Sequence, residues 1–434
     1  MMRIFQKVRE RIFWLNDLLH SGKLRNHLHD IKGILENYTS PASHERRESL
    51  LNKVLTHATT TTAYYSHLQN FNQLTDFPVV NKTIIRQDPT RFRARRKLGK
   101  THKISTSGST GTPFTVYHDE NKRLRNTADT IYFAGKANFS IGNKLIFLRI
   151  WVDQFKKSPL LARLQNIRMV NVTELDDASI HRLIKQLQKD PSEKGILGYA
   201  SALTQIGKYL DKIGSPPLKC NVTSIIAIAE SLTDYCKSSM EKYFGCPVVS
   251  RYSNLENGII AQQYPGPDSS FHINWASYVL EILEQDQDVP AVAGTSGRIV
   301  ITDLFNYAMP MIRYDTGDMG IMKEVNGIPV LQSVQGRRMD MIYDTAGNAV
   351  NPMVVWKILD YKGIRQFQLI QQDKKTYTIR LSLDGEFHEQ ESLIRTYQEH
   401  LGRDAVIQIE ITHEIPVLAS GKRKLVVNNY IQGT

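Results

Sequence analysis

The sequence predicts an α/β protein with a large N-terminal domain and a small C-terminal α+β domain. The chain has 434 residues, enough for one large domain and one small one. Strand-like and helix-like segments alternate from Leu145 to Arg251, a pattern typical of parallel sheets covered by helices. Hydrophobic residues make up 41% and charged residues 23% of the chain, so we expect a sizeable core rather than extensive disorder.

Charge and hydropathy narrow the class of partner. Lys and Arg outnumber Asp and Glu by 55 to 43, which favours anionic ligands such as nucleotides, acidic glycans or anionic lipids. No nucleic-acid-binding module accompanies this charge, and we expect no nucleic-acid partner. The most apolar stretch, Leu145–Val152, contains Arg149 and is too short to span a bilayer. A charged N-terminus and only three cysteines lead us to expect a cytoplasmic protein.

Residues 1–75 are predicted to be helical. Hydrophobic residues recur there at helical spacing within a basic segment: Ile4, Val8, Ile12, Leu15 and Leu19. Such a stripe either docks on the protein's own core or lies on a membrane surface. We expect docking on the core, which leaves peripheral membrane contact as the less favoured alternative. Pro78–Lys100 is predicted to be a polar connector.

The clearest structural unit is a strand, a helix and a second strand. Val222–Ala229 is a β-branched apolar run, Ser231–Phe244 is helical with a cap expected at Ser231, and Pro247–Tyr252 is a second apolar run. Short connections predict a right-handed crossover between parallel strands. Glu230 and Glu256 then follow the carboxyl ends of strands, at the sheet edge where ligands bind in open α/β sheets.

The C-terminal third is predicted to contain more β structure. Residues 295–345 are expected to form shorter β segments separated by Gly and Asp turns. A strand, a helix and a strand around Phe367–Ile411 then predict a small α+β domain with its own core.

The segment Ser105–Pro113 (STSGSTGTP) has the composition of a phosphate-binding loop. Gly108 and Gly111 leave the backbone free to point several N–H groups at one anion, and the hydroxyl side chains add further donors. No GxxxxGK pattern follows, so the segment is not a Walker A loop. A flexible connector is the alternative explanation of the same composition.

Two further segments contain carboxylates that suit a nucleotide and a metal. Tyr252–Gly258 (YSNLENG) places Glu256 beyond a predicted strand, where an exposed carboxylate suits Mg²⁺ or is a solvated turn acid. Within Asp303–Asp318, Asp318 is expected in a tight Thr-Gly-Asp turn and can accept hydrogen bonds from both ribose hydroxyls. Asp after Gly is also ordinary turn chemistry.

Two C-terminal segments supply cations. Gly336–Asp340 (GRRMD) can offer guanidinium donors to a nucleotide, with a surface charge cluster as the alternative. In Ser420–Lys424 (SGKRK), Gly421 permits close backbone approach and Lys422 provides a mobile positive charge, unless the run is a solvated tail.

In this order, the five segments resemble those of the adenylate-forming superfamily, and within it the phenylacetate–CoA ligase family with its capsular polysaccharide biosynthesis branch. Weaker matches are PVVNK (residues 78–82), GYASAL (198–203) and AES (229–231). The resemblance implies a large N-terminal adenylate-forming domain with parallel or mixed sheets over residues 1–336, including the helical lead-in over 1–75. It also implies a hinge over 337–340 and a small mobile C-terminal domain, residues 341–434, that carries the lysine.

The resemblance also implies roles for individual residues, with ATP and Mg²⁺ as ligands. Glu256 would hold Mg²⁺, and Lys422 would act at the α-phosphate. Asp318 would bind ribose, and Arg337 would contact ribose or phosphate. The residues beside the adenine would be Ala229, Glu230 and Tyr252. The residues holding the β- and γ-phosphates would be Ser107, Gly108, Ser109, Thr110, Gly111 and Thr112.

The implied reaction is activation of a small carboxylic acid as an acyl-adenylate, followed by transfer to CoA, a carrier-protein thiol or an amine, in surface polysaccharide biosynthesis. The alternatives are AMP transfer to a hydroxyl and a non-catalytic nucleotide-binding component of a polysaccharide assembly complex. Three departures from the family pattern concern the acceptor more than the ATP site. Met339 replaces one of two adjacent hinge acids, Ser253 replaces a glycine after Tyr252, and DTAGNAVNP lacks the usual basic residue before Gly347.

Overall fold

The computed structural model describes residues 2–95, 99–105, 114–151, 156–172, 175–337, 342–350, 354, 357–358, 361–415 and 426–430. The chain divides into two compact units. The larger consists of Met1–Ser105, Thr115–Thr316 and Ile321–Ser333, and the smaller of Thr106–Phe114, Gly317–Gly320 and Val334–Thr434. The domain boundary at residue 336 and the hinge over 337–340 remain predictions, because residues 338–341 lie outside the described residues.

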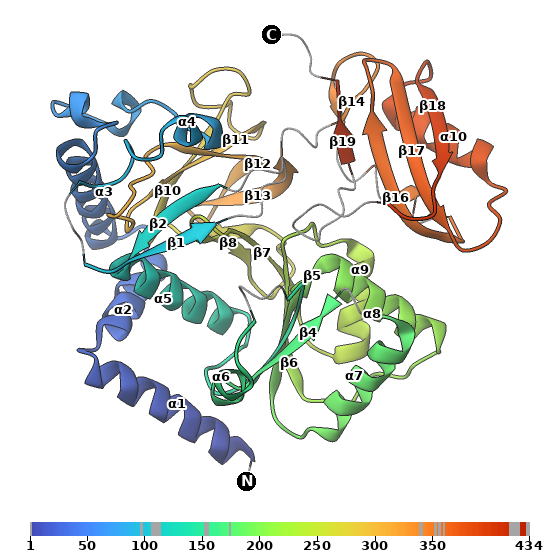
Figure 1. Ribbon diagram of the computed structural model, residues 1–434, viewed down its shortest axis with the longest axis horizontal. Helices are drawn as coiled ribbons and strands as arrows, with labels where there is room; N and C mark the ends of the chain where they lie inside the picture. Colours follow the sequence, from blue (N-terminus) through green and yellow to red (C-terminus); the bar gives the residue numbers. More distant parts are fainter. Residues whose placement is uncertain are drawn as a thin grey trace. The chain divides into compact units, whose positions relative to one another are not determined.

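The predicted α/β fold class is confirmed by a mixed sheet of 11 strands (Figure 1). Its strands are β3 (Lys144–Arg149), β4 (Ile167–Asn171), β5 (Lys194–Tyr199), β6 (Val222–Ile228), β7 (Val248–Asn254), β8 (Gly258–Gln263), β9 (Phe271–Ile273), β10 (Tyr278–Leu283), β11 (Ser296–Asp303), β12 (Tyr314–Val325) and β13 (Ile328–Arg337). The strand order is β10-β11-β12-β13-β9-β8-β7-β6-β5-β3-β4. Neighbouring strands pair in parallel along β7-β6-β5-β3-β4. In contrast, β8 pairs antiparallel with both β7 and β9.

Helices cover both faces of the parallel half. Figure 1 shows α7 (Asp177–Lys189), α8 (Ala200–Lys212) and α9 (Asp234–Phe244) together on one side of β5 and β6. Their apolar stripes form one buried cluster with the strands, to which Leu183, Leu203 and Met240 belong. On the other face, the residue after α5 (Glu120–Lys136) packs against Ile226 and Val249. The short helix α6 (Pro159–Leu164) precedes β4.

The predicted strand–helix–strand unit is present as β6, α9 and β7. Ile226 lies opposite Val249 in a parallel pair, so the predicted parallel pairing is confirmed. The expected cap at Ser231 is wrong, because the Thr233 side chain accepts the hydrogen bond from the Cys236 N–H at 3.1 Å. The helix therefore begins later and leaves a longer loop after β6, where ligands bind in such sheets.

The N-terminal residues form α1 (Met2–Leu19), α2 (Lys23–Leu35) and α3 (Pro41–Thr61), which confirms the predicted helices. The 3-10 turns η1 (Ser66–Leu68) and η2 (Leu74–Asp76) follow, then α4 (Lys82–Gln87) and a hairpin of β1 (Thr101–Ser105) and β2 (Thr115–Asp119). The expectation that the apolar stripe of α1 docks on the core is wrong, because Val8, Ile12 and Leu15 are exposed. No helix among the described residues has the length and hydropathy of a membrane span.

The smaller unit is an α+β domain, as predicted. Its sheet has the order β18-β17-β16-β19, and α10 (Gln390–Leu401) buries Leu393 and Tyr397 in the same core. The strands are β16 (Ile364–Gln371), β17 (Thr376–Leu383), β18 (Val406–Ile411) and β19 (Val426–Asn428), with a hairpin of β14 (Ile342–Tyr343) and β15 (Ala349–Val350). The expectation of shorter β segments over residues 295–345 is wrong for β12 and β13, which have 12 and 10 residues.

Candidate active site

Glu256 is buried in the turn between β7 and β8. Its Oε1 atom lies 2.7 Å from Lys82 Nζ and accepts a hydrogen bond from the Tyr314 hydroxyl at 2.9 Å. The expectation of an exposed turn carboxylate is therefore wrong. A buried carboxylate is stable only when its charge is compensated, and here an ammonium and a phenol compensate it. The Lys82 ammonium thus pairs with the same carboxylate that the sequence analysis expects to bind a metal ion.

The predicted polar connector delivers Lys82 to this site. Val80 forms a parallel bridge with Tyr314, in which the Val80 N–H donates to the Arg313 carbonyl at 3.0 Å and the Asp315 N–H donates to the Val80 carbonyl at 2.7 Å. The Asn81 side chain then accepts from the Ile84 N–H at 3.0 Å and caps α4, so that Lys82 is its first residue. One bridge therefore fixes Lys82 and Tyr314 relative to the same carboxylate.

His118, on β2, contacts the backbone of the same turn. Its Nε2 donates to the Glu256 carbonyl at 2.8 Å, and the side chain is buried. Burial, followed by the nearby Lys122 ammonium, lowers the pKa of His118 below its usual value. A neutral imidazole with the proton on Nε2 therefore holds the turn in place. Sequence reasoning misses His118, because no motif surrounds it.

Tyr252 and β12 are joined by a hydrogen bond. The Tyr252 hydroxyl donates to Thr316 Oγ1 at 3.3 Å, and Thr316 in turn donates to the Ile299 carbonyl at 2.9 Å. Asp318 lies two residues further along β12 and is half-buried. The predicted tight turn at Asp318 is wrong, because β12 continues through it, although the preceding Gly317 has a positive φ of 79°.

Glu230 occupies a second place at the carboxyl edge of the parallel strands. Its carboxylate accepts a hydrogen bond from the Ser201 N–H at 2.8 Å, near the start of α8, where the preceding Tyr199 offers no side-chain cap. A carboxylate is favourable at the positive end of a helix. Ala229 has φ of 69°, a strained conformation for a residue with a side chain, and such strain clusters at functional sites. Burial raises the pKa of Tyr199 above its usual value, and the Arg149 guanidinium opposes the rise.

The remaining predicted site residues are not placed by the structure. Ser107–Thr112 and Lys422 lie outside the described residues. Arg337 ends β13, but its side chain is not among those described. Within the described part of the chain, no three His, Cys, Asp or Glu side chains are grouped as a metal site. A metal ion at Glu256 would therefore need ligands from a bound substrate.

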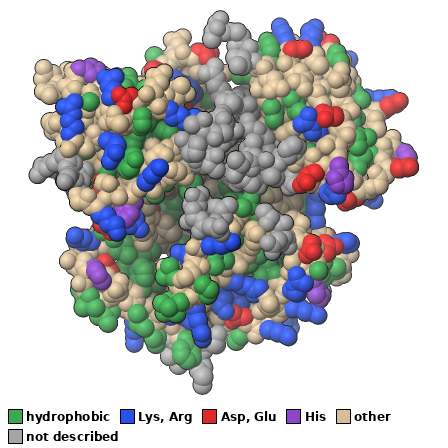
Figure 2. All heavy atoms as spheres, in the orientation of Figure 1, with side chains coloured by type: hydrophobic (Ala, Val, Ile, Leu, Met, Phe, Trp, Pro, Cys, Tyr) green, Lys and Arg blue, Asp and Glu red, His purple; other side chains and the backbone are tan. Residues whose placement is uncertain are grey.

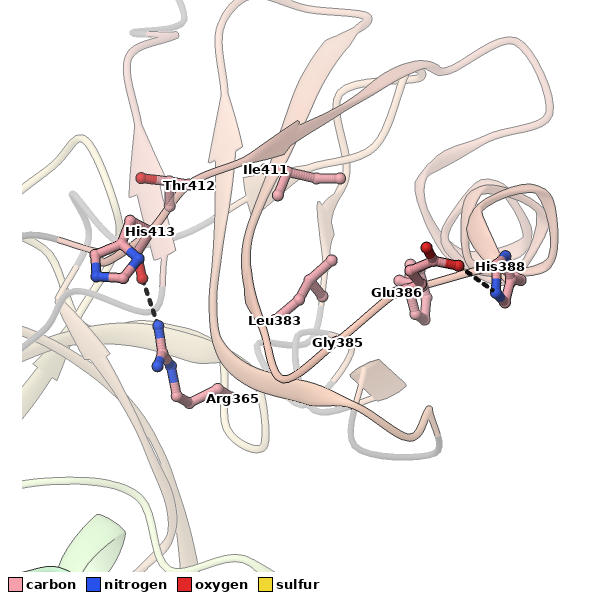
Figure 3. A pocket seen from close by; sticks show the side chains of 9 residues that line it. Arg365, Leu383, Gly385, Glu386, His388, Ile411, Thr412 and His413 are labelled. Atoms are coloured by element: carbon pink, nitrogen blue, oxygen red, sulfur yellow. Dashed lines mark hydrogen bonds and ion pairs between the residues drawn. The ribbon is translucent and has the colours of Figure 1, made fainter.

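A pocket of about 590 Å³ in the smaller unit does not belong to this site (Figure 3). Arg365 Nη2 donates to the His413 carbonyl at 2.5 Å, and His388 Nε2 lies 3.3 Å from Glu386 Oε2. Arg365 and the pair of His388 with Glu386 thus already have partners within the smaller unit. None of the residues lining it belongs to the predicted site.

The fold is shared with ligases of known structure. It resembles 2-hydroxyisobutyryl-CoA ligase in the postadenylation state, with a TM-score of 0.68 and 16% identity over 91% of this chain and 94% of that one. It also resembles the amide bond synthetase McbA from Marinactinospora thermotolerans, with a TM-score of 0.55 and 16% identity over 77% and 69% of the two chains. ATP-bound MatB from Rhodopseudomonas palustris gives a TM-score of 0.54 and 14% identity over 74% and 66%. The fold is that of the adenylate-forming ligases.

Sequence comparison gives a narrower relationship. Residues 342–429 match the model of the CapK C-terminal domain. The chain is also 24% identical over 388 residues to Protein CapK from Staphylococcus aureus, covering 83% of this chain and 80% of the relative. Both matches confirm that the sequence resembles CapK proteins.

Proposed function

We propose that this protein uses ATP in the cytoplasm to activate a small carboxylic acid as an acyl-adenylate, with release of pyrophosphate. One observation carries the proposal. Two segments that the sequence resemblance assigns to a nucleotide site, and the weaker match over residues 78–82, meet at one carboxylate: Lys82 and Tyr314 both contact Glu256. This convergence lies at the sheet edge where ligands bind in open α/β sheets, within a fold shared with ATP-dependent ligases.

Glu256 fits a Mg²⁺ ion that arrives with ATP. Mg²⁺ is commonly held by one or two carboxylates together with phosphate oxygens. Glu256 is such a carboxylate, and its Oε1 atom already attracts a positive group, the Lys82 ammonium at 2.7 Å. When bound, the ion would offset negative charge on the phosphates. Lys82 would then help to balance the charge of the same site.

The chain's own residues supply positioning and charge stabilisation. The substrate carboxylate attacks the α-phosphate of ATP and pyrophosphate leaves in line, a reaction that requires little covalent chemistry from the protein. In the proposal, Ser107–Thr112 donate to the β- and γ-phosphates, Asp318 accepts from the ribose and Arg337 contacts ribose or phosphate. Lys422 neutralises charge developing between the carboxylate and the α-phosphate.

The proposal extends to the acceptor of the acyl group and to the biosynthetic role of the protein. Transfer to CoA is favoured by the likeness to a CoA ligase, and a carrier-protein thiol or an amine follows. The relationship to CapK favours a role in surface polysaccharide biosynthesis. Transfer would follow movement of the small domain about residues 337–340, since hinge closure commonly assembles a second active arrangement.

The test is acid-dependent pyrophosphate release by the purified protein with ATP and Mg²⁺. A panel of aryl, fatty, amino and sugar acids is supplied, and hydroxylamine traps the acyl-adenylate as a hydroxamate. We expect release and hydroxamate with one acid class. AMP retained on a hydroxyl product would support AMP transfer instead, and ATP binding without release across the panel would support a binding component.

A further inference from the structure

Helix α1 presents a continuous apolar stripe to solvent. Residues separated by three or four positions lie on one face of a helix. The members of this stripe and their exposed fractions are Phe5 56%, Val8 42%, Ile12 60%, Leu15 56% and Leu19 76%. A surface helix of a globular protein normally turns such a stripe towards the core. Here the stripe faces away from it.

The face of α1 that packs on the protein is polar. Gln6 and Asp17 are eleven positions apart, which is about three helical turns, so they share the face opposite the stripe. Both are buried: the Gln6 side-chain amide donates to the Glu193 carbonyl at 3.2 Å, and Asp17 accepts from the Leu24 and Arg25 N–H groups at 3.0 and 3.1 Å. Specific polar contacts therefore fix the helix with its apolar side outwards.

Basic and aromatic groups flank the stripe. Lys7, Arg11 and Arg25 line a groove with Trp14, and the Arg25 guanidinium lies 5.1 Å from the centre of the Trp14 ring. Arg9 lies on the other flank and is exposed. Residues 2–25 carry six Lys or Arg against two acids. An aromatic ring beside cations and an apolar stripe is the side-chain set of helices that lie at a lipid interface.

A second exposed apolar element adds to this surface. Leu160 and Leu164 of α6 are 70% and 69% exposed, and Arg163 lies between them in the sequence. Gly142 connects the two helices, since its backbone approaches Gln6 of α1 and its carbonyl accepts from Asn166, just after α6. Figure 2 shows hydrophobic and basic side chains intermixed along the lower left edge of the view, where Figure 1 places α1 and α6.

We propose that α1 docks on the surface of an anionic lipid bilayer. The helix has 18 residues, about 27 Å at 1.5 Å per residue, and its stripe would lie in the bilayer plane between acyl chains and headgroups. Lys7, Arg9 and Arg11 would then meet lipid phosphates. A two-fold pairing of α1 with a second copy fits less well, because an isologous contact brings like charges together. This surface is independent of the ATP site.

The test is co-sedimentation of the purified chain with vesicles of phosphatidylglycerol and phosphatidylcholine, and with phosphatidylcholine vesicles alone. We expect binding to the anionic vesicles that weakens at high salt, and at least about tenfold weaker binding to the neutral ones. Leu15→Glu should lower the partition coefficient at least about tenfold, because it places a charge in the stripe that the bilayer would bury. Lys7→Glu with Arg11→Glu should do the same.

Val292→Glu is the matched control, because Val292 is 69% exposed and lies far along the chain, between β10 and β11. It should bind anionic vesicles as the parent chain does, and circular dichroism should show every variant folded. Equal binding of all variants, or no binding by the parent chain, would overturn the proposal. A dimer in analytical ultracentrifugation that Leu15→Glu converts to monomer, without vesicle binding, would assign the stripe to a second copy instead.

Discussion

Lys82 Nζ lies 2.7 Å from Glu256 Oε1, and this contact joins the N-terminal connector to the turn between β7 and β8. The two side chains differ in accessibility, since Glu256 is 2% exposed and Lys82 is 27% exposed. The ammonium therefore compensates a carboxylate that water barely reaches, while it remains partly hydrated itself. Removing the lysine would leave a buried carboxylate without this ammonium, while the Tyr314 hydroxyl still donates to it.

Lys82→Met should lower the free energy of unfolding by about 2 to 3 kcal/mol, somewhat below the usual loss for a broken buried pair, because the lysine is partly hydrated. Urea denaturation measures the change. Lys323→Met is the matched control: its Nζ lies 3.4 Å from Asp268 Oδ1 in an exposed pair, which should contribute less than about 1 kcal/mol. Adding Glu256→Gln to Lys82→Met should recover part of the loss, since no buried charge remains. Strictly additive losses would mean that the pair does not couple.

Asp318→Ala should raise the KM for ATP at least about tenfold, because a charged acceptor of two ribose hydroxyls contributes about 1.5 to 3 kcal/mol per hydrogen bond. Pyrophosphate release at varied ATP measures the change. The matched control is Asp268→Ala, which removes an exposed aspartate that pairs with Lys323. An unchanged KM in the Asp318 variant, with the fold intact, would remove Asp318 from the nucleotide site.

The parallel half of the sheet is predictable from sequence because its signals are local. The β-branched run that becomes β6 and the helix that becomes α9 are each recognisable without knowledge of their neighbours. The Lys82 contact is different. Whether residues 78–82 form a connector or part of a site depends on the bridge between Val80 and Tyr314, and no local pattern specifies that pairing.

Hydrophobic periodicity likewise shows which residues share a face of a helix, but not whether that face is turned towards the core or towards solvent. The spacing of Val8, Ile12 and Leu15 correctly predicts the apolar stripe of α1. It does not show that Gln6 and Asp17, on the opposite face, hold the helix on the protein through backbone partners. Those partners are distant in sequence or belong to the next helix. The burial of Glu256 is hidden for the same reason, since its compensating cation comes from α4.

Lys422→Ala should leave ATP binding intact and lower the rate of pyrophosphate release about 100- to 1000-fold, the usual loss for one transition-state donor. Isothermal titration with ATP and the release assay separate the two effects. Lys424→Ala is the matched control within the same segment. Turnover near that of the parent chain in the Lys422 variant would show that Lys422 does not stabilise the transition state at the α-phosphate.

A proline substitution tests the proposed hinge over residues 337–340. Asp340→Pro should restrict the backbone of residues 339–340 and so block domain movement. Pyrophosphate release should persist, while formation of the acyl thioester with CoA should fall at least about tenfold. Asp340→Ala is the matched control, because it removes the same side chain without the proline ring that restricts the backbone. Equal loss of both steps in Asp340→Pro would argue against a hinge here.

His27 should make stability depend on pH. Burial, and then the Arg125 guanidinium, lower the pKa of His27 to about 4, while Asp30 and Asn121 oppose the change. Its ring packs edge-to-face on Phe305 at 5.7 Å. The folded state keeps this imidazole neutral, whereas the unfolded chain protonates it near its ordinary value of 6.5. Its contribution to stability is therefore complete above about pH 6.5 and is lost as the pH falls towards 4.

His27→Gln should accordingly flatten the fall in the free energy of unfolding between pH 7 and pH 4.5. Over this pH range, we expect the free energy of unfolding to fall by about 1 kcal/mol less in the variant than in the parent chain. This difference is smaller than the pKa shift alone implies, because solvent still reaches the ring. His388→Gln is the matched control, since His388 is exposed and pairs with the equally exposed Glu386. Urea denaturation across the pH range gives both slopes. Parallel slopes for the His27 variant and the parent chain would mean that Arg125 and burial do not hold this histidine neutral.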